Sequence, residues 1–413
     1  MNKINLFCTS CSSKGIVKTG KRKNKNQTLQ RYKCNSCNKT FTDTRLKNKT
    51  YPAKIILNTI SYYNLGYNQN KVLKLISSKF KTKVPQRTIS EWLKEYKTIC
   101  TYNKLRPEAI KQYNPQNIIF SKTFQHIQPY TFKYHKAKLF LLFHNKLYNN
   151  EFHNISLFYE PLKNYLEKIS TKAFPHHIFT YHRNPNWISR MPKKRSFFVH
   201  NKDSQSRPLP AAPHEVRRLQ SAKNNLINKI ENENKIGNFW MGHQNNKRAS
   251  QIKFQHLQIK TLSKNNFACK LAKLALNLAT TNKHRHEAIQ NFMLINDSTT
   301  IATEVPIYLT NWDAGYYRNE KGFIFPLNNY TTPITGHIDL LQIRNGLIHI
   351  LDYKPEADKI NSIEQLTIYS MALSQKLNLP LYYFKAAWFD ENNYFEFFPL
   401  HTVYVLKNSV KCE

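Results

Sequence analysis

Acidic residues are scarce in this sequence. Only 25 of its 413 residues are Asp or Glu, against 63 Lys or Arg, which gives a formal net charge of +38. Residues 1–100 alone hold 22 basic residues and three acids. A general bias towards Lys would explain the total but not this concentration. Because such an excess repels itself unless a polyanion or solvent screens it, nucleic acid is the first partner to consider.

Membrane spans, secretory signals and disulfide frameworks are also missing from the pattern. No apolar run approaches the roughly 18 residues of a span. The N-terminal MNKINLFCTSC lacks the apolar segment of a secretory signal. Four of the seven cysteines form two CxxC pairs and three are scattered, which is typical of metal binding in a reducing compartment. We therefore expect a cytoplasmic, DNA-associated protein.

The chain has no internal repeat and divides by composition into four regions. We expect a cysteine-bearing unit over 1–50, helices over 51–104, a middle region of unknown function over 105–240, and an α/β domain over 252–413. Three prolines in SQSRPLPAAPHE suggest a linker at 204–215. The histidines of the middle region fit no ligand spacing, so we assign no site there.

The two CxxC pairs predict a zinc ribbon. Cys8-x2-Cys11 and Cys34-x2-Cys37 are separated by 22 residues, with a basic KRKNKNQ segment between them. Two such turns present four thiolates at about 2.3 Å from one Zn²⁺, which closes a tetrahedral site. A closed site leaves no open position, so the zinc would be structural. The alternative is four free thiols in a disordered tail.

Residues 51–104 show the periodicity of three short helices. Apolar residues recur at helical spacing after Pro52, between Gly66 and Phe80, and after Pro85. In the third helix Ile89, Trp92, Leu93 and Tyr96 would face inward, which leaves a polar and basic outer face: Arg87, Ser90, Lys94 and Lys97. This arrangement is typical of a helix-turn-helix whose last helix enters the DNA major groove. A plain three-helix bundle is the alternative.

These first hundred residues resemble part of a known family. Residues 5–45, with QRYKCNSCNKTF, look like the zinc ribbon of insertion-sequence transposases, and 51–97 look like the helix-turn-helix that follows it. The resemblance implies DNA binding and mobile-element ancestry. The transposase catalytic domain does not visibly follow in this sequence.

The segment GHIDLLQIRNGLIHILDYKPE at 336–356 predicts a hairpin that carries acids. Asn345-Gly346 favours a two-residue type I′ turn, which pairs Arg344 with Leu347. Counting outward places Asp339 opposite Asp352, with Cβ atoms roughly 4.5–5.5 Å apart. Lys354 follows two residues later on the same face.

Two opposed carboxylates repel each other unless a hard cation lies between them. Carboxylate oxygens with retained waters suit Mg²⁺ or Mn²⁺, which clamps a phosphodiester and acidifies a water. Lys354 would orient that water or neutralise the phosphorane. The alternative is an edge hairpin with solvated acids, which the long apolar flanks make difficult to justify.

Further candidates flank this hairpin. Upstream, IATEVPIYL at 301–309 predicts a strand with Glu304 as a third carboxylate, followed by a loop of about two dozen residues. The helix before that strand contains His284 and His286. Downstream, Gln365 and Tyr369 are four residues apart and lie on one helix face.

The order Glu304, Gly336-x-x-Asp339, Asp352-x-Lys354 and Gln365-x3-Tyr369 resembles the RecB-like branch of the PD-(D/E)XK nucleases. The resemblance spans roughly 265–400. It implies that Asp339 and Asp352 are metal ligands, that Lys354 is the catalytic lysine, and that the helix with Gln365 and Tyr369 contacts DNA and orders the site. It also implies a helix histidine on the metal, for which the spacing to Glu304 favours His286 over His284.

We therefore expect a multidomain chain: an N-terminal zinc ribbon and three-helix helix-turn-helix, then a C-terminal α/β restriction-endonuclease-like core with a mixed sheet flanked by helices. The expected function is an Mg²⁺- or Mn²⁺-dependent deoxyribonuclease that the N-terminal units target to DNA. Two alternatives stay open: a transposition or recombination protein, and a non-catalytic DNA-binding regulator.

Overall fold

The computed structural model describes the chain over the following residues: 8, 10–11, 13–24, 27–42, 46, 49–124, 129–143, 155–171, 248–254, 261, 263–323, 325 and 333–403. The suggested linker at 204–215 lies outside the described residues. Within them, no helix combines the length and apolar character that a membrane span requires.

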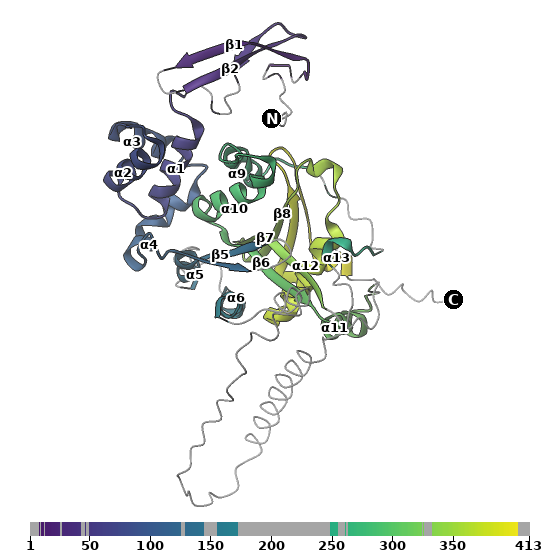
Figure 1. The fold of residues 1–413 in the computed structure, drawn as a ribbon. Coiled ribbons are helices and arrows are strands. Elements are labelled where there is room, and N and C mark those ends of the chain that lie inside the picture. Colours follow the sequence, from purple (N-terminus) through teal and green to yellow (C-terminus); the bar gives the residue numbers. More distant parts are fainter. Residues whose placement is uncertain are drawn as a thin grey trace, which may run out of the picture.

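A small antiparallel sheet lies at the N-terminal end of the molecule (Figure 1). Its strands, in the order β1-β2-β3, are Ile16–Asn24, Gln27–Cys34 and Thr40–Thr42. The backbone at Gly20 has φ +112°, and the β1–β2 register shifts there, between Lys18 and Lys21. The sheet brings the two CxxC segments together, as described below.

Three helices follow, where the apolar periodicity of residues 51–104 predicts them. They are α1 at Ala53–Asn64, α2 at Gln69–Phe80 and α3 at Gln86–Glu95. α1 ends before Gly66, whose φ of +111° disfavours other residues, and the Asn68 side chain caps α2. As expected, Trp92 is buried, while the side chains of the polar face are exposed: Arg87, Ser90, Lys94 and Lys97.

The second sheet is large and mixed, as predicted. Its order is β10-β9-β8-β7-β6-β5-β4, and among the described strands only β8 and β9 pair in parallel. The strands in chain order are Ile119–Phe124, Tyr130–His135, Thr300–Leu309, Ile334–Arg344, Leu347–Tyr353, Phe384–Phe389 and Tyr394–Phe397. β4 and β5 come from the middle region, so the sheet extends beyond the domain limits expected at 252–413.

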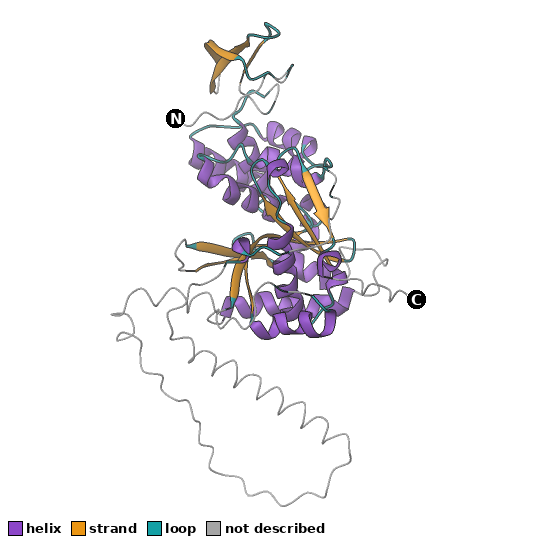
Figure 2. Ribbon diagram, turned by 90° about the vertical axis from the view of Figure 1, so that its right-hand side faces the viewer, coloured by secondary structure: helices purple, strands orange, loops and turns teal. Residues whose placement is uncertain are grey.

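Helices cover both faces of this sheet (Figure 2). On one face α12 (Ile363–Leu377) packs with α6 (Ile155–Thr171) and α11 (Asn311–Lys321) in one continuous apolar core. On the other face lie α9 (Phe267–Ala275) and α10 (Arg285–Asn296). Among the residues that the structure describes, the other α-helices are α4 at Arg106–Gln112, α5 at Lys136–Phe143 and α13 at Pro399–Val403.

The expectation of a long loop between β6 and β7 is wrong, because α11 occupies its first half. Thr310 and Asp313 form a reciprocal capping box at the start of this helix, and Gly322 ends it with φ +65°. Both are ordinary helix boundary signals. The segment NWDAGYYRNEK between these boundary residues has only weak apolar periodicity, so its sequence does not stand out as a helix.

The three N-terminal helices share a core with the large sheet. Apolar residues of α1 to α3 belong to the same buried cluster as α9, α10 and the sheet residues Leu340 and Leu351. A buried amide pair strengthens the contact, since Nδ2 of Asn64 donates to Oδ1 of Asn296 at 2.8 Å. Residues 51–104 therefore form a unit that is docked on α10 rather than a separate globular domain.

A buried lysine fixes the C-terminal end of α10. Nζ of Lys138, on α5, donates to the main-chain oxygens of Leu294 and Thr300 at 2.6 and 2.7 Å, and also to that of Asp297. These carbonyls lie between the end of α10 and the start of β6. α10 and β6 thus have a fixed relative position, and both contribute to the site.

Candidate functional site

The central hairpin has the register that its turn predicts. Asn345 and Gly346 have φ of +50° and +69°, as a type I′ turn requires. The pairs run from Arg344 opposite Leu347 to Leu340 opposite Leu351. Asp339 and Asp352 stand at the next position, so these two acids lie on neighbouring strands at one level.

Glu304 continues this row onto β6. Its neighbours Thr303 and Val305 pair with Leu340 and Ile338, which places Glu304 at the level of Asp339. Its φ is +51°, a left-handed conformation that is rare for a non-glycine residue and costs of order 1–3 kcal/mol. Nε2 of Gln290, on α10, donates to Oε1 of Glu304 at 2.6 Å. Backbone strain of this kind clusters at functional sites, which supports Glu304 as a functional residue.

Lys354 lies just beyond the end of β8 and contacts Asp352. Its backbone N–H donates to the oxygen of Phe389 on β9 at 2.9 Å, which fixes the chain there. Its Nζ is 2.8 Å from Oδ2 of Asp352. The ammonium group of Lys354 and the carboxylate of Asp352 thus form a close ion pair within the site.

Burial and mutual repulsion disturb the protonation of this row. Burial, followed by the charge of Asp339, raises the pKa of Asp352 to about 7. The same two causes raise the pKa of Glu304 to about 7. Burial also opposes ionisation of Asp339, but its contact with His286 and the charge of Lys354 lower the pKa of that carboxyl. Burial and mutual repulsion thus disfavour the simultaneous ionisation of all three carboxylates.

His286 reaches this row and His284 does not. Nδ1 of His286 lies 3.3 Å from Oδ2 of Asp339. Burial disfavours the imidazolium, but the hydrogen bond and charge of Asp339 raise the pKa of His286. His284 is exposed and its Nδ1 contacts Oγ1 of Thr281 at 2.6 Å. Only His286 occupies the place expected of the helix histidine.

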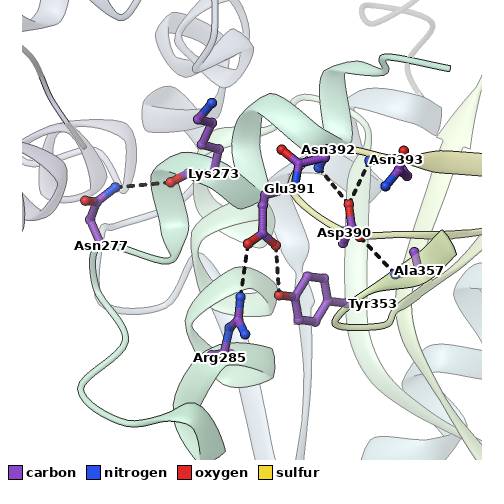
Figure 3. A network of polar contacts seen from close by, with 9 residues as sticks. All are labelled: Lys273, Asn277, Arg285, Tyr353, Ala357, Asp390, Glu391, Asn392 and Asn393. Atoms are coloured by element: carbon purple, nitrogen blue, oxygen red, sulfur yellow. Dashed lines mark hydrogen bonds and ion pairs between the residues drawn. The ribbon is translucent and has the colours of Figure 1, made fainter. Parts of the chain in front are cut away.

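A second polar network holds α10 against the sheet beside the site (Figure 3). Glu391 accepts from Nη2 of Arg285 at 3.1 Å and from the hydroxyl of Tyr353 at 3.4 Å. The backbone N–H of Tyr353 in turn donates to Oδ2 of Asp339 at 3.1 Å. Tyr353, which lies between Asp352 and Lys354 in the sequence, therefore orients the carboxylate of Asp339 on β7.

Gln365 and Tyr369 lie on one face of α12, as predicted. Nε2 of Gln365 donates to the hydroxyl of Tyr369 at 2.9 Å. The tyrosine ring lies against the backbone of Gly336. Burial, followed by the charge of Asp352, raises the pKa of Tyr369 well above its usual value. This phenol therefore stays protonated over the whole physiological range.

These side chains surround one pocket of about 640 Å³. All seven candidates from the C-terminal region line it: His286, Glu304, Asp339, Asp352, Lys354, Gln365 and Tyr369. Further polar residues line the pocket without having been predicted from the sequence, among them Lys133, Arg248, Lys283, Gln290 and His337. Helical spacing from His286 would have indicated Gln290, and strand alternation from Asp339 would have indicated His337. For Lys133 and Arg248 the sequence offers no signal, because both come from outside the recognised motifs.

The four N-terminal cysteines form a compact cluster. Their sulfur atoms all lie within 4.8 Å of one another. Sγ of Cys8 is 3.5 Å from that of Cys37, and the distance from Cys11 to Cys34 is the same. A tetrahedral Zn²⁺ with bonds of about 2.3 Å implies sulfur separations of about 3.8 Å. This set can bind zinc, and among the described residues no other group of three or more potential ligands lies as close together.

Comparisons with models of protein families, with curated proteins and with solved structures return no match to this chain. The functional interpretation therefore rests on the residues and on their geometry.

Proposed function

We propose that this protein is a metal-dependent nuclease that cuts DNA. The observation that carries the proposal is the pocket in which Asp339, Asp352 and Lys354 meet, with Nζ of Lys354 2.8 Å from Oδ2 of Asp352. A buried and a half-buried acid on neighbouring strands of a mixed sheet, with a lysine directly after one of these strands, are a set that suits metal-assisted phosphodiester hydrolysis.

The donor set fits a hard divalent cation such as Mg²⁺ or Mn²⁺. Mg²⁺ keeps several waters and needs only one or two carboxylates, so Asp339 and Asp352 suffice although the row is less compact than the cysteine cluster. Adjacent ligands of an octahedral ion at about 2.1 Å lie about 3 Å apart. The 3.3 Å between His286 Nδ1 and Asp339 Oδ2 is compatible with that geometry. When bound, such an ion polarises the phosphodiester and lowers the pKa of a water.

Side chains of the pocket would perform the other steps of the reaction. The ammonium of Lys354 would stabilise the charge that develops on the phosphorus oxygens. Glu304, held by Gln290 in a strained conformation, would orient or deprotonate a water. The protonated Tyr369 and its partner Gln365 offer hydrogen bonds to the DNA strand that enters the pocket.

The N-terminal units would supply most of the grip on DNA. A zinc-filled cysteine cluster would stabilise the basic β1–β2 hairpin. α3 exposes a polar and basic face whose members are Arg87, Ser90, Lys94 and Lys97. A helix of this kind fits the major groove, and its lysines contact phosphates. The arrangement supports, as part of the proposal, the resemblance to transposase-like zinc ribbons and helix-turn-helix units.

The order of the site along the chain supports the second resemblance. The acids and lysine lie on β6, β7 and the end of β8, and the following helix α12 carries Gln365 and Tyr369. We accordingly assign the large sheet and its helices to the PD-(D/E)XK nucleases, RecB-like branch.

Cleavage assays on plasmid and linear DNA test the proposed function. We expect the full chain to cut with Mg²⁺ or Mn²⁺, to lose this activity in EDTA, and to be inactive as Asp339→Asn. Inactivity of the wild-type protein on every DNA tried, with DNA binding retained, would instead favour a non-catalytic DNA-binding protein.

A further inference from the structure

Three cations from separate parts of the chain line the same pocket as the acids. They are Lys133 on β5, Arg248 just before the helical turn Ala249–Gln251, and Lys283 in the turn Asn282–His284 before α10. Two of them precede the region of the nuclease motifs. Asp352 is buried in the pocket and Asp339 and Glu304 are half-buried, whereas Arg248, Lys283 and the lining acid Glu287 are exposed.

Lys133 is brought there by the strand hairpin of the middle region. β5 contacts β6 through two pairs, and one of them sets Lys133 opposite Thr303, the neighbour of Glu304. Nζ of Lys133 donates to Oδ1 of Asn291, on α10, at 2.7 Å. The amide is neutral, so this half-buried ammonium has a hydrogen bond but no paired anion in direct contact.

Arg248 and Lys283 are fixed by the backbone rather than by ion pairs. A parallel bridge joins Arg248 to Thr335, the residue before Gly336. Lys283 lies directly before α10, the helix that carries His286. Within the described part of the chain, no salt bridge forms to any of the three cations.

Acids inside and unpaired cations at the rim suit a charged polymer better than a small anion. A single phosphate would meet only part of this surface, and free anions would be repelled by the acids below. A nucleic acid strand has regularly spaced phosphates, so one can lie over the acids while its neighbours meet the rim. Burial lowers the pKa of Lys133, which an adjacent phosphate would offset.

We propose that Lys133, Arg248 and Lys283 form a binding subsite for the DNA phosphates that flank the scissile one. The inference rests on the proposed nuclease function and adds a set of substrate contacts that the catalytic residues do not provide. It also gives the β4–β5 hairpin a role, namely to carry a phosphate contact to the edge of the sheet beside Glu304.

Salt dependence of binding tests the subsite without using catalysis. The full chain as Asp352→Asn would be titrated with a fluorescent DNA duplex at several KCl concentrations, with no divalent metal added and no chelator. Each phosphate contact contributes about 0.9 to the slope of log affinity against log salt. Lys133→Ala should lower the slope by about 0.9. The rim variant, in which Lys133, Arg248 and Lys283 are all replaced by Ala, should lower it by roughly 2.7. Lys133→Arg should keep the original slope.

A matched triple variant controls for the loss of net charge. Lys111→Ala, Lys122→Ala and Lys163→Ala remove three positive charges that do not line the pocket. Lys122 pairs with Phe132, so its side chain lies on the hairpin face opposite to that of Lys133. The control should leave the slope near its wild-type value, and thermal melting should show that all variants are folded.

The outcomes separate the subsite from the proposed function. If the rim variant has the same slope as the control, the subsite is wrong even when the wild-type protein cuts DNA. If the slope falls as expected but the wild-type protein never cuts, the phosphate contacts stand and the nuclease proposal fails.

Discussion

Tyr369 lies so close to Gly336 that only glycine fits there. A Cβ atom at position 336 would be 2.3 Å from Cε1 of Tyr369 and 2.9 Å from its Cζ. Cβ atoms in proteins do not approach other heavy atoms this closely, so either β7 or α12 would have to move. The glycine of the GHID segment thus permits α12 to bring its tyrosine against β7 beside the acids.

Gly336→Ala should therefore displace Tyr369 and destabilise the fold by roughly 1–3 kcal/mol, as overpacking in a close-packed interior does. We expect a large loss of cleavage at the same time, because the pocket wall moves. Combining it with Tyr369→Ala should cost less than the sum of the two single changes, since the smaller side chain makes room for the new methyl group. Denaturant unfolding of the wild type, the two single variants and the double variant measures these free energies. Strict additivity of the two losses in stability would show that the two residues do not clash.

Trp92 and Lys94 should separate folding from DNA binding. Trp92 is 5% exposed and packs edge-on against Tyr51 with ring centroids 5.3 Å apart. Trp92→Ala should cost about 3–5 kcal/mol of stability. Lys94 is exposed, so Lys94→Ala should leave unfolding unchanged and lower the salt slope of DNA binding by about 0.9. The opposite pattern would mean that α3 presents its other face to DNA.

Zinc should be required for DNA binding but not for the large sheet. A hydrogen bond from the backbone N–H of Cys37 lowers the pKa of the Cys34 thiol to about 6, which favours the thiolate that zinc binds. We expect one zinc per chain by native mass spectrometry. Cys34→Ser should remove the zinc and most of the DNA affinity, whereas Cys269→Ser, outside the cluster, should keep both. Undiminished DNA affinity in the zinc-free variant would count against the ribbon's role.

Stability without divalent metal should fall as the pH rises. The folded-state pKa of Asp352 is raised to about 7, against about 3.9 in an unfolded chain. Between about pH 4 and pH 7 the folded state binds more protons than the unfolded state, so the free energy of unfolding decreases with pH there and the contribution is lost above pH 7. Asp352→Asn removes this dependence and should melt higher than the wild type at pH 8.

The advantage of Asp352→Asn should shrink towards pH 4, where the wild-type carboxyl is protonated in the folded state and increasingly protonated in the unfolded state. Added Mg²⁺ should raise the melting temperature of the wild type but not that of the variant, because a ligand stabilises the state that binds it. Thermal melts at both ends of this pH range provide the measurement. An equal difference between the two proteins at every pH would show that Asp352 is already ionised in the metal-free fold.

Local signals were enough to predict much of the site. The Asn345-Gly346 turn sets the register of its hairpin within a few residues, so the shared level of Asp339 and Asp352 follows from counting. Helical spacing likewise places Gln365 beside Tyr369. In each case the partners lie on one element or on two strands joined by a short turn.

Long-range pairing was beyond the sequence. β5 joins β6 through residues about 170 positions apart, and this pairing places Lys133 at the pocket beside Thr303. Nothing in the local pattern marks Glu304 as a left-handed residue inside a strand. The packing of α1 against α10 could not be predicted either. Its buried contact joins Asn64 and Asn296, and a polar residue in a sequence does not signal burial.

The single-turnover rate of DNA cleavage in saturating Mn²⁺ tests the central claim most directly. Three variants would be compared with the wild type: Asp352→Asn, Lys354→Ala and the exposed control Asp358→Asn. We expect Asp352→Asn to lose cleavage and Mn²⁺ binding, and Lys354→Ala to lose at least about 100-fold in rate while it still binds Mn²⁺. Asp358→Asn should match the wild type. Cleavage by Asp352→Asn at the wild-type rate would contradict the assignment of this pocket as the active site.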